Sequence, residues 1–301
     1  MRNACFFFLF LLVGYNYQMI EAVVYSFTSM PVWYQVVTVA VLGGIMGSFL
    51  NVVVYRMHTG ASLSGRSRCF SCGETLTPRE LIPFFSWIVQ KGRCRYCSAR
   101  IPVRDFLMEI GMGIMFVWVY LTATGIFGLF FSLAFVSVSV LIFVYDLVHM
   151  IIPDEMVLLL ILLAAVFLGY EVWQNDAFSI ILPHLYAALL ATSILGLLWL
   201  VSKGRWMGLG DVKLVFPLAL LLDVTQAFSL VIISFWIGAL IGIVLLLYPR
   251  VVYLYRRYTL GAIAKTTRYF TMKSEIPFAP FILVAFWLVY LYEINIFTLL
   301  Y

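Results

Sequence analysis

The sequence predicts an all-α membrane protein, a helix bundle with about eight spans and one long polar loop. Hydrophobic residues make up 64% of the 301 residues and charged residues only 11%, whereas soluble domains carry about 25% charged residues. So few charges cannot cover a globule in water, and lipid must therefore cover much of the chain. The composition excludes a soluble enzyme, a disordered tail and a nucleic-acid module driven by bulk positive charge. Membrane lipid is the expected surrounding, and no nucleic-acid partner is expected.

The apolar stretches determine the expected helices. A helix needs about 20 mostly apolar residues to cross a bilayer, and it satisfies its own backbone hydrogen bonds in lipid. The sixth span is short and joins the seventh almost directly. The eight predicted spans lie near residues 32–54, 106–124, 127–145, 155–173, 178–201, 212–225, 226–248 and 277–297.

The basic residues predict the orientation of the bundle. Short cytoplasmic loops of membrane proteins carry an excess of Lys and Arg. If the N-terminus lies outside, every one of the 19 Lys and Arg residues except Arg2 falls at the cytoplasmic face. The cytoplasmic segments are then 55–105, 146–154, 202–211 and 249–276.

The N-terminus carries an apolar run from Phe6 to Val13 behind Arg2. This run resembles the hydrophobic region of a signal peptide and is short for a membrane span. Three readings stay open: a cleaved segment, a surface anchor or a partial ninth span.

The long polar loop contains two C-x-x-C pairs that are separated by 21 residues: Cys69 with Cys72, and Cys94 with Cys97. Two such pairs supply the four thiolates of a tetrahedral metal site. A small residue, Gly73 or Ser98, follows each pair directly and suits a tight turn. The spacing predicts a zinc ribbon with a structural Zn²⁺, because four protein ligands leave no open position. Two disulfides are the alternative, and the reducing cytoplasm argues against them.

Carboxylates are costly in a bilayer and are therefore functional candidates there. Asp146 ends the third expected span and Asp211 begins the sixth, so both lie at the same face and can meet. Two adjacent carboxylates share a proton, since both cannot readily ionise. One then acts as a base on water and the other as an acid, as in aspartic proteases.

Several residues near this pair have candidate roles. Gly208 and Gly210 precede Asp211 and let the backbone approach closely. Lys213 is interpreted as a positive-inside residue more than as a catalyst. Asp154 competes with Asp146 for the catalytic role, but it follows Pro153 and can instead cap a helix.

The first span holds small residues at four-residue spacing, Gly43 with Gly47 and Gly44 with Ser48. Such spacing lets helices pack closely in lipid. Asn51 follows on the same span and has two readings, helix packing or substrate binding. The role of Glu109, early in the second span, stays open.

In this order the motifs resemble those of the type IV prepilin leader peptidases, bacterial membrane aspartic proteases of the GxGD type. The resemblance covers about residues 40 to 285. Its elements are a G-x-x-G-S-x-L-N-V-x-x-x-R run from Gly44 to Arg56, the four cysteines, the D…PD segment from Asp146 to Asp154, the G-x-G-D-V-K-L segment from Gly208 to Leu214, and Ile276 to Phe281. Departures are Asp105-Phe106 where the family usually has Tyr-Pro, and Ala279 where it has Gly.

The resemblance implies that Asp146 and Asp211 are the catalytic pair. It further implies cleavage of the short leader of prepilins or pseudopilins at the cytoplasmic face of the bacterial inner membrane. Many members then N-methylate the new N-terminus with S-adenosylmethionine. No Rossmann glycine signature is present, so this second activity rests on the resemblance alone.

The expected organisation has four parts: an N-terminal extension (1–31), the first transmembrane span (32–54), a cytoplasmic zinc-binding domain (55–105) and a transmembrane aspartic protease domain (106–301). The alternatives are a proton-coupled transporter, a protease without methyltransferase activity, and a zinc-ribbon scaffold whose aspartates only cap helices. A transporter would place its carboxylates nearer the bilayer midplane and would show internal repeats, and neither feature is found in the sequence.

Overall fold

The computed structural model describes residues 26–59, 65–123, 125–260 and 276–299. The apolar run 6–13 lies outside the described residues. The chain divides into two compact units, Met1–Val140 and Leu141–Tyr301. Within the described ranges every regular element is a helix, and no strand forms. The all-α prediction is therefore confirmed.

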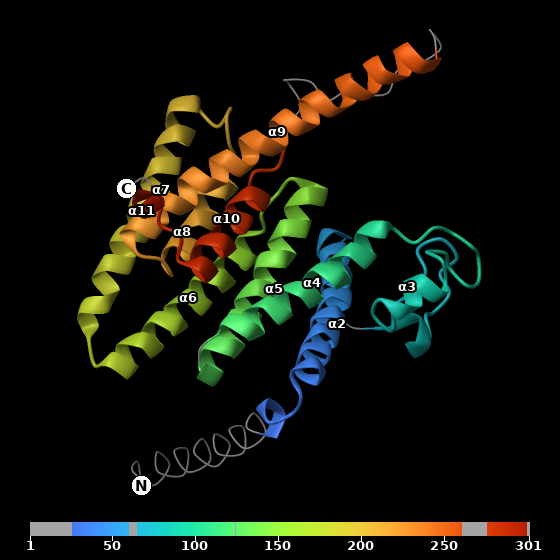
Figure 1. Cartoon of the computed structure of the whole chain (residues 1–301), viewed down its shortest axis with the longest axis horizontal. Coiled ribbons are helices and arrows are strands. Elements are labelled where there is room, and N and C mark those ends of the chain that lie inside the picture. Colours follow the sequence, from blue (N-terminus) through green and yellow to red (C-terminus); the bar gives the residue numbers. More distant parts are fainter. Residues whose placement is uncertain (1–25, 60–64, 124, 261–275, 300–301) are drawn as a thin grey trace. The chain divides into compact units, whose positions relative to one another are not determined.

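Six of the described helices are long and apolar enough to cross a membrane. These are α2 (Val32–Thr59), α4 (Val103–Thr122), α5 (Gly125–His149), α6 (Asp154–Asn175), α7 (Ile181–Ser202) extended by the 3-10 turn η2 (Phe178–Ile180), and α9 (Val224–Leu260) (Figure 1). They correspond to six of the eight expected spans. The chain is thus a multi-pass membrane protein.

The other two expected spans, 212–225 and 277–297, are shorter helices. They form α8 (Leu209–Ala219), with 11 residues, and α10 (Ala279–Tyr292), with 14 residues. At 1.5 Å per residue they are about 16 and 21 Å long, less than the ~30 Å of a bilayer core. The count of eight spans is therefore approximate.

The apolar character of α8 comes from burial in protein. Leu214, Leu218 and Ala219 are fully buried, and the helix contacts α6, α7, α9 and α10. Hydropathy along the sequence does not distinguish side chains covered by lipid from side chains covered by other helices. This explains why α8 resembled a span.

In the first unit, α2 packs closely against α4 along the small residues of α2. A Cβ added at Gly43 would lie 2.6 Å from the Met112 carbonyl oxygen and 2.8 Å from the Gly113 Cα. A Cβ at Gly47 would lie 2.9 Å from the Glu109 Cα. Backbone meets backbone at both places, as the four-residue spacing predicts.

We expect the Gly43→Ala variant to lose about 1–3 kcal/mol of stability, because the added methyl overpacks a backbone contact. Gly111→Ala in α4 is the matched control, since a Cβ there meets nothing within 4 Å. Thermal unfolding in detergent micelles measures both variants. Equal midpoints for the two variants would contradict the close packing.

Between α2 and α4 the polar loop forms two short helices, η1 (Pro78–Leu81) and α3 (Phe85–Val89). Phe84, just before α3, has a positive φ of 64°, which is uncommon for a residue with a side chain. Its backbone N–H donates a hydrogen bond to Glu109 Oε2 at 2.9 Å. Glu109, whose role the sequence left open, therefore anchors the loop to α4.

Candidate functional site

The second unit brings together two buried aspartates from different helices. Asp146 lies near the end of α5 with 4% of its surface exposed, and Asp211 lies in the first turn of α8 with 7% exposed. Asp211 Oδ2 accepts a hydrogen bond from the Gly208 backbone N–H at 3.2 Å. A carboxylate in the first turn is also favoured by the helix dipole.

The carboxyl groups of Asp146 and Asp211 are close enough for a direct charge–charge interaction. The backbone N–H of Ala279 donates a hydrogen bond to the Asp146 carboxyl. The Oδ2 atom of Asp146 is buried and has no hydrogen-bond partner among the described residues. Two neighbouring carboxyl groups in such surroundings hold one proton between them more readily than none.

Ala279 is the first residue of α10, and its N–H has no partner within the helix. This amide is free to donate to Asp146. The sequence singled out the segment from Ile276 to Phe281 only by resemblance. The structure adds a contact that no local pattern reveals, because Ala279 follows Asp146 by more than a hundred residues.

Asp154 and Lys213 form an ion pair that is exposed, unlike the two buried aspartates. Lys213 Nζ lies 2.8 Å from Asp154 Oδ1 and 3.0 Å from Oδ2, and the Asp154 side chain is 72% exposed. Pro153, not Asp154, is the N-cap of α6. An exposed pair of this kind contributes about 0–1 kcal/mol. The geometry therefore distinguishes the buried Asp146 from its competitor.

The two glycines before Asp211 differ in their surroundings. A Cβ at Gly210 would lie 3.2 Å from Ile152 side-chain atoms, so a larger residue would press on the segment before α6. A Cβ at Gly208 would meet Asp211 Oδ2 at an ordinary 3.6 Å. Gly210 thus permits a close approach, whereas Gly208 contributes its amide.

Asn51 lies in the first unit, where it lines a pocket made of that unit's own residues. Its Nδ2 donates a hydrogen bond to the Asp105 carbonyl oxygen at 3.0 Å. The hydrogen bond to α4 agrees with the helix-packing reading of Asn51. Its place in a pocket wall is compatible with a binding role, which no contact with a substrate tests.

The four cysteines lie on two turns of the same geometry. Gly73 N–H donates to the Cys69 carbonyl, and Ser98 N–H donates to the Cys94 carbonyl, each at 2.9 Å. Gly73 and Ser98 have positive φ values of 74° and 60°. Gly73 adopts such a φ without steric cost, whereas Ser98 is one of the residues with a side chain that adopt it here. Isolated bridges flank the turns, Arg68 with Thr75 and Arg93 with Arg100.

The four sulfur atoms of Cys69, Cys72, Cys94 and Cys97 lie within 4.8 Å of one another. The Cys69 and Cys97 sulfurs are 3.8 Å apart, too far for a disulfide bond of about 2.05 Å. A tetrahedron with Zn–S bonds of about 2.3 Å has sulfur–sulfur edges of about 3.8 Å. The cluster is therefore compatible with a structural zinc.

The surroundings of Cys69 favour the ligand form of its sulfur. Backbone N–H groups of Cys72 and Ser71 hydrogen-bond this sulfur and lower the pKa of the thiol to about 7. The thiolate, and not the thiol, is the metal ligand. Cys97 differs, because the Ala99 backbone hydrogen bond, which lowers the pKa of its thiol, is outweighed by desolvation and by hydrogen bonds with the other three cysteines, which raise that pKa to about 11.

Comparisons with known proteins match two separate regions of the chain, one before and one mostly after the boundary between the two compact units. Residues 41–123 match the family model for the bacterial peptidase A24 N-terminal domain. Residues 133–243 match the model for the type IV leader peptidase family. No solved structure matches the chain.

Three curated relatives carry the name prepilin leader peptidase/N-methyltransferase. The protein from Bacillus subtilis is 30% identical over 265 residues, which cover 85% of this chain and 94% of the relative. The protein from Dichelobacter nodosus is 29% identical over 280 residues, covering 84% and 90%. The protein from Myxococcus xanthus is 33% identical over 209 residues, covering 69% of this chain and 62% of the relative.

Proposed function

Because this chain belongs to the type IV leader peptidase family, we propose that it is a membrane aspartic endopeptidase for type IV prepilins or pseudopilins. It removes their leader peptides and N-methylates the new N-terminus, as the names of its relatives indicate. The observation that carries the proposal is the buried pair of Asp146 and Asp211 from two helices. A proton-coupled transporter is not favoured, since the family and the paired carboxylates both point to hydrolysis.

The aspartate pair suits general acid–base hydrolysis. The ionised carboxylate accepts a proton from water as the water oxygen attacks the scissile carbonyl carbon, and the protonated carboxyl donates to the carbonyl oxygen. As the carbon–nitrogen bond breaks, the amine leaves with a proton from the pair. Gly208 and Ala279 hold the two carboxyl groups through their backbone N–H groups.

The proposed site faces the cytoplasm of a bacterial inner membrane. Support comes from the basic residues, since all 19 Lys and Arg residues except Arg2 fall on one side of the expected topology. The substrate is then cut just before its hydrophobic segment, which lies in the same bilayer as the aspartates.

Two cofactors complete the proposal. Cys69, Cys72, Cys94 and Cys97 would hold a structural Zn²⁺ that orders the polar loop. S-adenosylmethionine, when bound, supplies an electrophilic methyl group on a positively charged sulfur. The new N-terminal amine would accept this methyl group and would release a proton to water.

The test combines the purified full chain in detergent with a synthetic substrate that has a short basic leader and an apolar helix. Mass spectrometry is expected to show one cut between leader and helix, and a product heavier by one methylene only when S-adenosylmethionine is added. An intact substrate would contradict the protease. A cut product that never gains mass would leave a protease without methyltransferase activity.

A further inference from the structure

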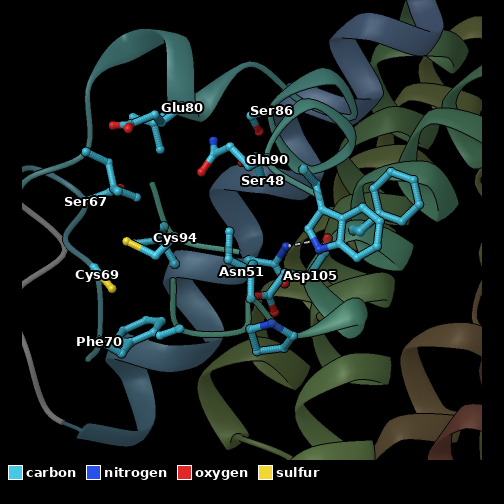
Figure 2. Close-up of a pocket in the computed structure, with 18 of the residues that line it drawn as sticks. Ser48, Asn51, Ser67, Cys69, Phe70, Glu80, Ser86, Gln90, Cys94 and Asp105 are labelled. Atoms are coloured by element: carbon cyan, nitrogen blue, oxygen red, sulfur yellow. Dashed lines mark hydrogen bonds between the residues drawn. The ribbon is translucent and has the colours of Figure 1, made fainter. Parts of the chain in front are cut away.

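The first unit contains a pocket that its own residues line, and neither Asp146 nor Asp211 is among them. Its volume is about 210 Å³, and its walls come from α2, the polar loop and the start of α4. Figure 2 shows Ser48 and Asn51 of α2, Glu80 of η1, and Cys69 and Cys94 of the metal turns around this space. The pocket lies within the part of the chain that matches the N-terminal domain model.

Three polar atoms in the pocket residues are buried without a hydrogen-bond partner in the described part of the chain: Asn51 Oδ1, Glu80 Oε1 and Trp87 Nε1. An unsatisfied buried polar group costs about 1–3 kcal/mol, so three in one place require an explanation. Two are acceptors and one is a donor. A ligand with two donors and one acceptor would satisfy all three.

The neighbouring atoms of these side chains are already fixed. Asn51 Nδ2 donates to the Asp105 carbonyl oxygen, the bond drawn as a dashed line in Figure 2. Glu80 Oε2 accepts hydrogen bonds from the Thr77 N–H at 2.7 Å and the Thr77 hydroxyl at 3.0 Å. The unpaired oxygens are therefore held in place and cannot turn toward other partners without breaking a bond.

Flat aromatic side chains form a part of the apolar wall, together with aliphatic residues such as Val52 and Leu81. The Trp87 ring stacks on Phe106 with centroids 4.5 Å apart and an interplanar angle of 16°, and Tyr55 packs on Phe70 at 4.2 Å. Such surfaces suit a planar ring and also attract a cation. The wall also carries charges of both signs, since its lining includes Arg68, Arg100 and Arg104 beside Glu80, Asp105 and Glu109.

We infer that this pocket binds S-adenosylmethionine through Asn51, Glu80 and Trp87, an inference that rests on the proposed methyltransferase activity. The ligand class matches the wall in three respects. An adenosine group offers amino and hydroxyl donors to Asn51 and Glu80, and ring nitrogens accept from the Trp87 indole N–H. Its base is planar, and its positive sulfonium and ammonium groups and its negative carboxylate can pair with the charges of both signs in the wall.

The test measures binding of tritium-labelled S-adenosylmethionine to the full zinc-loaded chain in detergent by equilibrium dialysis. Trp87→Phe removes only the indole donor, and Glu80→Gln replaces the acceptor with a similar shape. Each is expected to weaken binding at least about tenfold, which corresponds to ~1.4 kcal/mol. Trp33→Phe and Glu74→Gln are matched controls, because both residues are exposed and lie outside the pocket. Binding in the controls is expected to equal that of the wild type.

The outcomes separate the pocket from the activity. Equal binding by Trp87→Phe, Glu80→Gln and the wild type would overturn the pocket assignment and leave the methyltransferase proposal intact. A wild-type chain that neither binds the compound nor yields methylated product would overturn both. Displacement by ATP as strong as by unlabelled S-adenosylmethionine would also contradict the inference, since ATP shares the adenosine group but lacks the sulfonium and the amino-acid group. Zinc content and the thermal midpoint show whether each variant is folded. If Trp87→Phe loses its zinc, the binding measured for Glu80→Gln alone tests the pocket assignment.

Discussion

Asp146→Asn and Asp211→Asn are each expected to lower the rate of leader cleavage by about 10²–10⁴-fold, the usual contribution of a general acid or base. Asparagine keeps the shape of aspartate but cannot exchange a proton at neutral pH. Either change therefore removes one half of the acid–base pair. Initial rates on the synthetic prepilin-type substrate, with the variants in detergent, measure the effect.

Asp154→Asn is the matched control for these two variants. Asp154 has an exposed side chain that pairs with Lys213 and belongs to the same motif as Asp146. Its loss is expected to leave the rate within about threefold of the wild type, since an exposed pair contributes about 0–1 kcal/mol. Wild-type activity in either Asp146→Asn or Asp211→Asn would show that the pair is not catalytic.

Stability measurements distinguish lost chemistry from lost folding in the same variants. Replacing one of two buried neighbouring carboxyl groups with a neutral amide removes like-charge repulsion. The thermal midpoint of Asp211→Asn is therefore expected to equal or exceed that of the wild type. Inactivity combined with a much lower midpoint would point to misfolding and would leave the catalytic role unsupported.

Cys94→Ser is expected to release the metal and unfold the polar loop, because binding of a structural zinc supplies about 10–16 kcal/mol of folding free energy in small zinc domains. Cys94 is the buried member of the four cysteines. The zinc content, measured by elemental analysis, is expected to fall from one zinc per chain to none. Limited proteolysis is expected to cut between residues 65 and 102, where the wild-type chain resists.

Cys5→Ser is the control for this change, since Cys5 is the remaining cysteine and lies outside the described residues. It is expected to keep the full zinc content. A zinc-free wild-type chain with four oxidised cysteines would contradict the metal site and would restore the disulfide alternative. Because Cys69 and Cys94 also line the pocket of the first unit, loss of zinc is expected to abolish binding of S-adenosylmethionine as well.

Local patterns in the sequence predicted the elements that depend on local chemistry. The spacing of the cysteines, with Gly73 and Ser98 behind them, anticipated two tight turns and a cluster of four sulfurs. Long apolar stretches anticipated the membrane helices. The meeting of Asp146 and Asp211 followed from their position at the same end of their spans.

Other features depend on contacts between distant segments, and the sequence did not predict them. The apolar residues of α8 are covered by other helices, which hydropathy does not distinguish from lipid. The positive φ of Phe84 and its bond to Glu109 have no counterpart in the local residue pattern. The unpaired atoms of Asn51, Glu80 and Trp87 meet at one pocket only after the loop folds onto α2 and α4.

The amide of Ala279 bears on how far the protease can be shortened. The matched region of the leader peptidase model ends at residue 243, whereas the N–H that holds Asp146 belongs to α10. A fragment that stops at the matched region would keep both aspartates and lose the donor to one of them. The smallest chain with a complete pair of supported carboxyl groups therefore extends into α10, and α10 belongs to the proposed catalytic site.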